Sequence, residues 1–464
     1  MSLPQVTIPT LRPEMLGAPF PGTSLPDIPE ALAQVQQWID SAEEPVDERS
    51  SRWHAWPDQP GFTPVYGAVS LNTGAAGIAW YSLAAADASG DAAHAAHVAR
   101  AQRAAAYVAD NWRTLPETDF LGVPGTGFGH YGGLAGVGGV FLELSERFPE
   151  HKATAIAIFD EIASRAGENG GRSFGWTGAN ALLGDGGPII GLVEAARRLE
   201  QSRYLDTAIA AGLGILAEEL HDEHGSWWRG LDAQLLGLPA GQELDGFELG
   251  TVGIAFVFAT LAIATGDHRF QDAAARAADH IAATAILVGD AAVVARIGDT
   301  YSFGYCTGSS GAIRSFVQVY RATGAGIYLE WALRLGRGIL RSGVPGRQTP
   351  GNTWVHHQCC GSAAILESFI GLWLETGDPL WLEAANAQAD DLLIRSVVDD
   401  RGRRWYSESH VLPIGTLKAE VGHQVGASGI ALALLRLNEA NRARLETRGF
   451  RTIRLADDPF PPTS

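Results

Sequence analysis

Residues 305–311 read YCTGSSG, and the two glycines of this stretch stand directly before an apolar run. Copies of this glycine pattern recur along the chain, each in front of another apolar run. In the sixth copy, Ala364 takes the place of the second glycine. A motif repeated at near-regular spacing predicts similar units rather than two or three unrelated domains. The first glycines of the seven copies are Gly74, Gly133, Gly184, Gly250, Gly308, Gly361 and Gly426.

The spacing of the motif predicts two helices in each unit. Successive first glycines are 51 to 66 residues apart, which leaves room for two helices of about 12 to 18 residues and their loops. The run after each motif, such as 252–264, is apolar around most of its surface and predicts a buried inner helix. Amphipathic runs between motifs, such as 92–112 and 268–283, predict outer helices. We therefore expect an all-α protein, an α/α toroid of seven inner and seven outer helices, whose closure buries the end repeats.

The remaining segments are expected to flank this ring. Residues 1–59 are predicted to form an N-terminal extended arm, proline-rich over residues 1–28, followed by a first helix at 29–39. Residues 60–445 are predicted to form the seven-repeat toroid domain, and residues 446–464 a C-terminal tail.

Composition and charge exclude several classes of protein. Hydrophobic residues make up 46% of the 464 residues, which is enough for a large core. Lys and Arg number 34 against 52 Asp and Glu, and this net charge of −18 disfavours nucleic acid and anionic lipid as partners. No apolar run reaches about 18 residues without charge or glycine, so no membrane span is expected. The first residues lack a basic region followed by an apolar core, so we expect a cytoplasmic protein.

The three cysteines share one position relative to the motif. Cys306 lies two residues before Gly308, and Cys359 lies two residues before Gly361, with Cys360 next to it. Consecutive repeats are neighbours in a toroid, so these thiols should meet at helix N-termini, whose dipoles favour thiolate. Three ligands with an open fourth position are typical of catalytic zinc, so we predict one zinc ion per chain. The alternatives are three cysteines buried as small apolar residues or a disulfide between Cys359 and Cys360, which is sterically awkward.

Other polar residues precede the same glycines and are expected at the same mouth. His130 and His423 lie three residues before their glycines and His357 lies four before, which makes them candidate catalytic acids. Alternatively, each histidine could be hydrogen-bonded to a metal ligand without taking part in catalysis, or could lie in a solvent-exposed loop. Glu248 and Tyr305 lie two and three residues before their glycines and are predicted to contact substrate.

At these residues the sequence resembles the lanthionine synthetase C-like family, over about residues 60–440. The family pattern Trp-Cys-x-Gly in the fifth repeat is matched by YCTG at 305–308, and Cys-His-Gly in the sixth by CCG at 359–361. The resemblance implies a seven-repeat toroid with zinc at its mouth. It also implies that Cys306, Cys359 and Cys360 hold this zinc, with Cys360 in the place of a histidine.

The resemblance further implies a lanthipeptide cyclase that adds peptide cysteine thiols to dehydroalanine or dehydrobutyrine, forming (methyl)lanthionine thioether rings. The substrate would be a dehydrated precursor peptide from a separate dehydratase or kinase/lyase. Two positions depart from the family. Leu249 stands where the family has a histidine proposed as catalytic acid. Asn180 stands where bacterial cyclases have an aspartate, and we predict that it contacts substrate.

Two other functions stay open at this point. One is a non-catalytic toroid that keeps zinc for binding peptides or thiols, having lost the family's histidine and aspartate. The other is an α/α-toroid glycoside hydrolase with paired carboxylates, for which 13 Trp, 10 Tyr and 17 Phe residues would suit sugar stacking. The hydrolase leaves the shared position of the cysteines unexplained.

Overall fold

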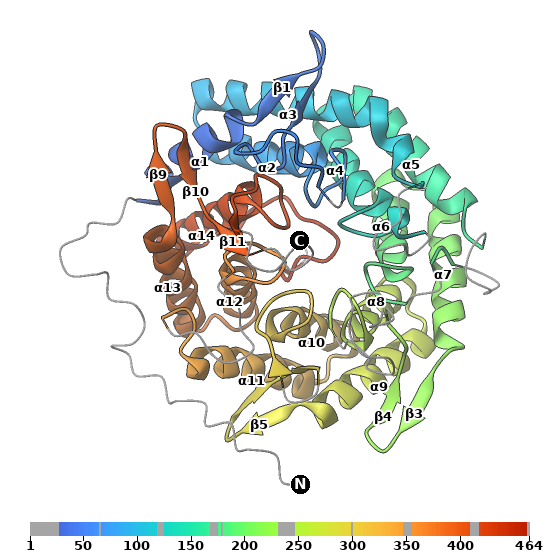
Figure 1. The fold of residues 1–464 in the computed structure, drawn as a ribbon. Helices are drawn as coiled ribbons and strands as arrows, with labels where there is room; N and C mark the ends of the chain where they lie inside the picture. Colours follow the sequence, from blue (N-terminus) through green and yellow to red (C-terminus); the bar gives the residue numbers. More distant parts are fainter. Residues whose placement is uncertain are drawn as a thin grey trace.

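A computed structural model of the protein describes residues 27–64, 66–117, 125–167, 175–177, 180–230, 246–297, 300–346, 355–408 and 417–461. Residues 1–26 of the extended arm predicted at 1–28 lie outside the described residues. Within them the fold is the predicted α/α toroid, and Figure 1 looks down the axis of the ring. None of the described helices is both long enough and apolar enough to cross a membrane.

Seven helices form a closed inner ring. Each packs against the next, and the last packs against the first, which completes the circle. Every one of these helices begins at or beside a motif glycine, as the sequence predicts. The inner helices are α2 (Ala75–Ala88), α4 (Leu134–Arg147), α6 (Gly186–Leu199), α8 (Thr251–Thr265), α10 (Ser309–Thr323), α12 (Ser362–Thr376) and α14 (Ala427–Glu446).

The outer layer is made by the helices that alternate with the inner ones. They are α3 (Asp91–Asn111), α5 (Lys152–Ser164), α7 (Ser202–Leu216), α9 (His268–Thr284), α11 (Gly326–Ser342) and α13 (Pro379–Arg395). The seventh outer place is taken by α1 (Ile28–Asp40), which packs against α14. The first helix, which the sequence groups with the N-terminal arm, therefore completes the outer layer. The domain boundaries at 59/60 and 445/446 stay predictions.

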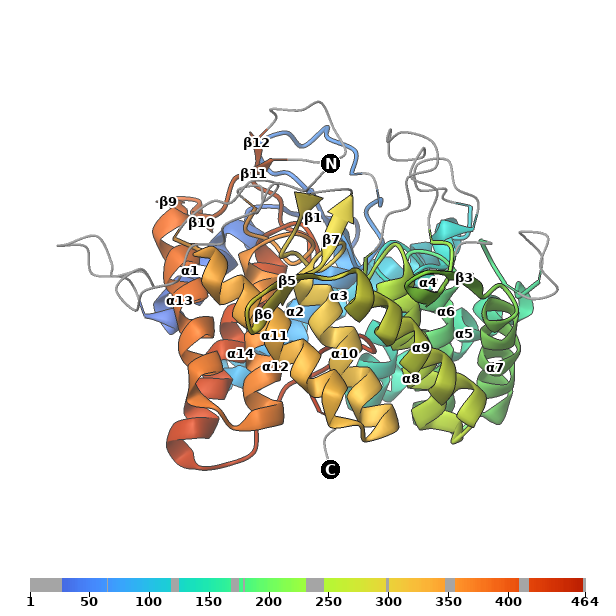
Figure 2. The same cartoon turned by 90° about the horizontal axis from the view of Figure 1, so that it is seen from below.

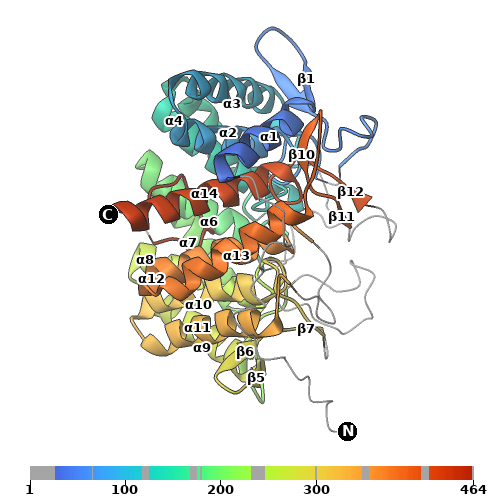
Figure 3. The same cartoon turned by 90° about the vertical axis from the view of Figure 1, so that its left-hand side faces the viewer.

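The described strands form two-stranded antiparallel pairs at one end of the ring, as Figures 2 and 3 show from the side. Short 3-10 helices lie at Trp112–Thr114, Thr126–Phe128 and Pro149–His151. The strand pairs are β1 (Glu43–Pro45) with β2 (Ser51–Trp53), β3 (Leu220–Asp222) with β4 (Gly225–Trp227), β5 (Ile286–Val288) with β6 (Ala291–Val293), β7 (Ala295–Ile297) with β8 (Thr300–Tyr301), β9 (Val397–Asp399) with β10 (Gly402–Arg404), and β11 (Ser407–Glu408) with β12 (Leu417–Lys418).

The two layers differ in the periodicity of their apolar residues. In α8 nearly every residue from Thr251 to Leu261 is buried, because the helix is covered by α6, α10 and α9. In α9 burial follows one face, with Phe270, Ala274 and Ile281 inside. Each fully buried large apolar side chain contributes about 1.5–3 kcal/mol. The all-round apolar helices are therefore held inside and the amphipathic ones outside.

The motif glycines are required because the preceding loop turns back onto the start of its own inner helix. A Cβ at Gly308 would lie 2.5 Å from the carbonyl oxygen of Ser302, and one at Gly311 would lie 2.1 Å from that of Tyr305. Both contacts are with backbone atoms, so no side-chain movement could relieve them. Each loop is thereby pressed against one end of the ring, and this close approach positions the candidate site.

Candidate metal centre

Backbone hydrogen bonds around the mouth of the ring join the residues two positions before the motif glycines, with His130 and Leu183 donating in place of their neighbours Tyr131 and Leu182. This mouth circuit links the loops of all seven repeats at the N-terminal ends of the inner helices. The N–H to O distances are Gln424 to Asn72 2.9 Å, Asn72 to Tyr131 2.9 Å, His130 to Leu182 3.2 Å, Leu183 to Glu248 3.1 Å, Glu248 to Cys306 3.1 Å, Cys306 to Cys359 3.1 Å and Cys359 to Gln424 2.8 Å.

The circuit brings the three cysteines together. The Sγ atoms of Cys306 and Cys360 are 3.2 Å apart, and those of Cys360 and Cys359 are 3.3 Å apart. All three sulfurs lie within 4.8 Å of one another. Among the described residues the three cysteines form no disulfide, and each cysteine residue is half-buried.

Glycines let the neighbouring loops approach closely enough for this cluster to form. A Cβ at Gly304 would lie 2.6 Å from Cα of Cys360, and one at Gly246 would lie 2.4 Å from the carbonyl oxygen of Cys306. In addition, the N–H of Tyr305 donates to the carbonyl of Cys359 at 3.0 Å. The fourth, fifth and sixth repeats are thus in direct backbone contact at the cysteines.

The donor set fits a zinc ion. Sulfurs bound to one tetrahedral zinc, with Zn–S bonds of about 2.3 Å, lie about 3.8 Å apart, slightly farther than the two short distances here. Hydrogen bonds to Cys306 and Cys360, together with burial, raise the pKa of the Cys359 thiol. The thiolate forms therefore need a nearby cation, and soft thiolates favour zinc. Among the described residues no carboxylate or imidazole joins this grouping.

Glu248 and Leu249 lie on the circuit next to the cluster. The backbone N–H of Glu248 donates to the carbonyl of Cys306, and its side chain is buried. Burial raises the pKa of Glu248 to about 8, with further contributions from Cys306 and Asp457. Leu249 is buried as well and carries no proton to transfer.

Tyr66 is a mouth residue that the sequence analysis missed. Its ring covers Gly132, where a Cβ would lie 2.4 Å from Cδ1 of the tyrosine. Burial raises the pKa of the Tyr66 hydroxyl, and the negative charges of Glu248 and the three cysteines add to this effect. The hydroxyl therefore lies among these groups. Tyr66 stands in the loop before the first motif, and no repeated pattern in the sequence marks it.

Two of the three predicted histidines meet around Tyr131. The ring of His130 lies 4.7 Å from that of Tyr131, and the ring of His423 stacks on it at 5.9 Å. Burial, followed by the charge of Arg436, lowers the pKa of His423 to about 3, so this imidazole is neutral at pH 7. His357 is buried in the loop of the sixth repeat, where its carbonyl accepts from Gly361 at 3.0 Å.

The other two predicted substrate contacts point into the protein. Asn180 is fully buried, and its Nδ2 donates to the carbonyl of Arg229 at 2.7 Å. The hydroxyl of Tyr305 donates to Asp457 at 2.9 Å, and its ring packs on Phe247 at 4.9 Å. A role for Asn180 or Tyr305 in substrate binding stays a prediction.

No protein-family model matches the chain, and no curated protein matches it by sequence. Among solved structures the chain is similar to nisin cyclase, with a TM-score of 0.59 and 14% identity over 80% of this chain and 89% of that one. It is also similar to a family 76 glycoside hydrolase, an α-mannanase of Bacteroides thetaiotaomicron, with a TM-score of 0.47, 14% identity and coverage of 91% and 98%. A third similar structure is a cellobiose 2-epimerase of Spirochaeta thermophila. Its TM-score is 0.45 and its identity 13%, over 68% of this chain and 86% of that one. At these identities the similarity establishes the toroid fold alone.

Proposed function

We propose that this protein is a zinc-dependent lanthipeptide cyclase. It would add cysteine thiols of a dehydrated precursor peptide to dehydroalanine or dehydrobutyrine residues of the same peptide, forming thioether rings. The observation that carries the proposal is the cluster of the half-buried residues Cys306, Cys359 and Cys360 at the mouth of a toroid similar in fold to nisin cyclase. The net charge of −18 suits a basic peptide partner.

The three cysteines would hold one zinc ion per chain. When bound, zinc acts as a Lewis acid that lowers the pKa of a coordinated substrate thiol, so that thiolate forms at neutral pH. The mouth circuit holds the three ligands in place through backbone bonds of Cys306 and Cys359. The three cysteine residues are half-buried and not fully enclosed.

The chain must also deliver a proton to the α-carbon of the dehydrated residue. The predicted donors are His130, His357 and His423, because Leu249 cannot act as an acid. Nδ1 of His130 and Nδ1 of His423 have no hydrogen-bond partner among the described residues. We favour His130, because Asp457 holds its other ring nitrogen at 2.8 Å and leaves Nδ1 available.

Metal content and ring formation test the proposal together. Zinc is measured in the purified wild type and in Cys306→Ala, Cys359→Ala and Cys360→Ala, with Leu445→Ala, 83% exposed at the far end of α14, as a control. Ring formation is followed as the loss of alkylatable thiol in a dehydrated, cysteine-containing peptide. We expect the cysteine variants to lose zinc and activity and the control to keep both.

Other outcomes reject the proposal in different ways. Full zinc retention in a folded cysteine variant would remove that residue from the site. A zinc-loaded wild type that forms no rings on any dehydrated peptide would favour the non-catalytic toroid that binds peptides or thiols. A zinc-free protein that releases reducing sugar would favour the glycoside hydrolase.

Alanine variants of the three histidines identify the donor. A positioned acid contributes on the order of 10²–10⁴-fold in rate, so His130→Ala should slow ring formation by that factor while keeping its zinc. Changes below about threefold in all three variants would assign the proton to water instead.

A further inference from the structure

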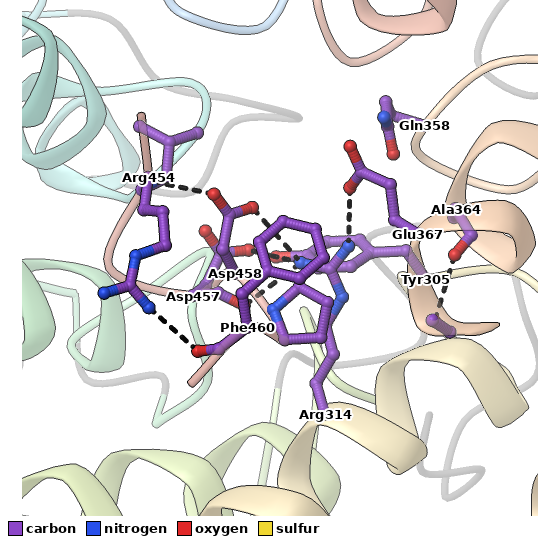
Figure 4. A network of polar contacts seen from close by, with 12 residues as sticks. Tyr305, Arg314, Gln358, Ala364, Glu367, Arg454, Asp457, Asp458 and Phe460 are labelled. Atoms are coloured by element: carbon purple, nitrogen blue, oxygen red, sulfur yellow. Dashed lines mark hydrogen bonds and ion pairs between the residues drawn. The ribbon is translucent and has the colours of Figure 1, made fainter. Parts of the chain in front are cut away.

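The segment that follows α14 returns into the ring and places two adjacent aspartates in its interior (Figure 4). Both side chains are buried. Asp458 accepts from Nη1 of Arg436 on α14 at 3.1 Å, and the main-chain oxygen of Asp457 accepts from Nη1 of Arg314 on α10 at 3.0 Å. Both arginines also donate to Glu367 of α12, at 2.7 Å and 3.2 Å. The segment is thus anchored by charged groups of three inner helices.

The carboxylate of Asp457 gathers side chains from two loops of the mouth. Its Oδ1 lies 2.8 Å from Nε2 of His130, and its Oδ2 accepts from the hydroxyls of Tyr131 at 2.8 Å and Tyr305 at 2.9 Å. Burial acts to raise the pKa of Asp457, but His130 and Arg314 lower it below its ordinary value, so the carboxylate is ionised at neutral pH. One buried anion therefore ties the loop before α4 to the loop before α10.

The imidazole ring of His130 is held in one orientation by Asp457. Nε2 faces the Asp457 carboxylate, and the buried Nδ1 has no hydrogen-bond partner among the described residues. A carboxylate that holds one ring nitrogen sets the tautomer and orientation of the ring. The opposite nitrogen is then available to move a proton.

Tyr305 links the same carboxylate to the metal centre. Its hydroxyl is held by Asp457, Arg314 lies over its ring at 4.9 Å, and its backbone N–H donates to Cys359. Cys306 is the next residue in the chain. The position of the Tyr305 ring, and with it the loop that carries Cys306, is therefore fixed from inside the ring.

We propose that Asp457 is a positioning residue of the cyclase: it orients His130 for proton transfer and holds Tyr305 beside Cys306, an inference that rests on the proposed function. In the step concerned, the C–S bond forms as the substrate thiol loses its proton and the carbon–carbon π bond breaks. The electron pair of that bond moves onto the α-carbon and its carbonyl, and Nδ1 of His130 supplies the proton to the α-carbon. The proton lost by the substrate thiol replaces the proton that His130 gave to the α-carbon, so no other reactant is consumed.

The experiment compares Asp457→Asn with Asp458→Asn. The two aspartates are neighbours, both buried and both paired with arginine, but Asp458 pairs with Arg436 and not with His130. Three properties are measured in each full-length variant: zinc content, the rate of ring formation, and the ¹⁵N shifts of the His130 ring nitrogens without substrate. The His130 signals are assigned from their loss in His130→Gln.

We expect Asp457→Asn to keep zinc, to shift the His130 nitrogens and to slow ring formation by about 10²-fold or more. Asp458→Asn should leave the nitrogens in place and the rate within about threefold of the wild type. Adding Asp457→Asn to His130→Ala should cause a smaller loss than it causes in the wild type, because the part of its effect that passes through His130 is already gone. Unshifted nitrogens with equal rates in the two asparagine variants would overturn the inference.

Two further results keep the inference separate from the function on which it rests. If the wild type forms no rings, the cyclase proposal fails, while the ¹⁵N shifts still decide whether Asp457 orients His130. If Asp457→Asn does not fold, the wild type is examined for a low-field proton resonance of the His130–Asp457 hydrogen bond. Loss of this resonance in His130→Gln supports the inference, and its absence from the folded wild type rejects it.

Discussion

Replacing Gly304 with alanine should weaken zinc binding by forcing two loops apart. The added Cβ would lie 2.6 Å from Cα of Cys360 and 2.9 Å from its carbonyl carbon. Ordinary van der Waals contact begins at 3.4 Å, so the loops must separate by about 0.8 Å. The obstructing atoms belong to the backbone, and no flexible side chain can move aside for the new methyl group.

This separation acts directly on the metal ligands. Cys306 is two residues from Gly304, and its Sγ lies 3.2 Å from that of Cys360. Metal–ligand distances vary by only about 0.2 Å, so a shift of about 0.8 Å is well beyond the range that an intact site accepts. We expect zinc affinity to fall by about 10- to 100-fold, as when residues that orient metal ligands are changed. The overpacking should also cost about 1–3 kcal/mol of unfolding free energy.

Zinc affinity is measured by competition with a chromophoric chelator, and folding is followed by circular dichroism during denaturation. Gly326→Ala is the matched control, because a Cβ at Gly326, the first residue of α11, meets no atom within 4 Å. If Gly304→Ala binds zinc as tightly as Gly326→Ala while both stay folded, close backbone approach is not what assembles the cysteine cluster.

Three further predictions concern the ligand set, the core and the response to pH. Cys360→His should keep zinc and more cyclase activity than Cys360→Ala, because imidazole and thiolate both suit tetrahedral zinc; equal metal loss in both would refute their equivalence. Ile254→Ala, at a fully buried position of α8, should cost about 2–5 kcal/mol in denaturant unfolding, whereas Ile263→Ala, at a 51% exposed position, should cost under about 0.5 kcal/mol. Burial, followed by the charge of Arg100, lowers the pKa of His97 from 6.5 to about 4. The unfolded chain therefore binds more protons between these two values, and stability should rise with pH through this window. His97→Gln should flatten that rise, and an unchanged slope in urea titrations at several pH values would contradict it.

The toroid and the meeting of the cysteines can both be predicted from the amino-acid sequence. Both depend on a pattern that repeats along the chain. Each motif glycine marks the start of an inner helix, and all seven inner helices begin at the same mouth. Residues that lie the same number of positions before their motif glycines must then become neighbours in consecutive repeats. Cys306 and Cys359 share that distance, and their backbones are hydrogen-bonded at 3.1 Å.

The residues that surround the cysteine cluster could not be predicted from the repeat and became known from the folded structure. Asp457 comes from a segment without periodicity and lies 327 residues from His130. Its main-chain oxygen accepts a hydrogen bond from Arg314 on α10. Tyr66 reaches the mouth from the loop before the first motif, and α1 fills the outer place beside α14. A buried carboxylate is stable only where cations and hydroxyl groups converge on it. That convergence is a property of the closed ring, and no local stretch of the chain carries it.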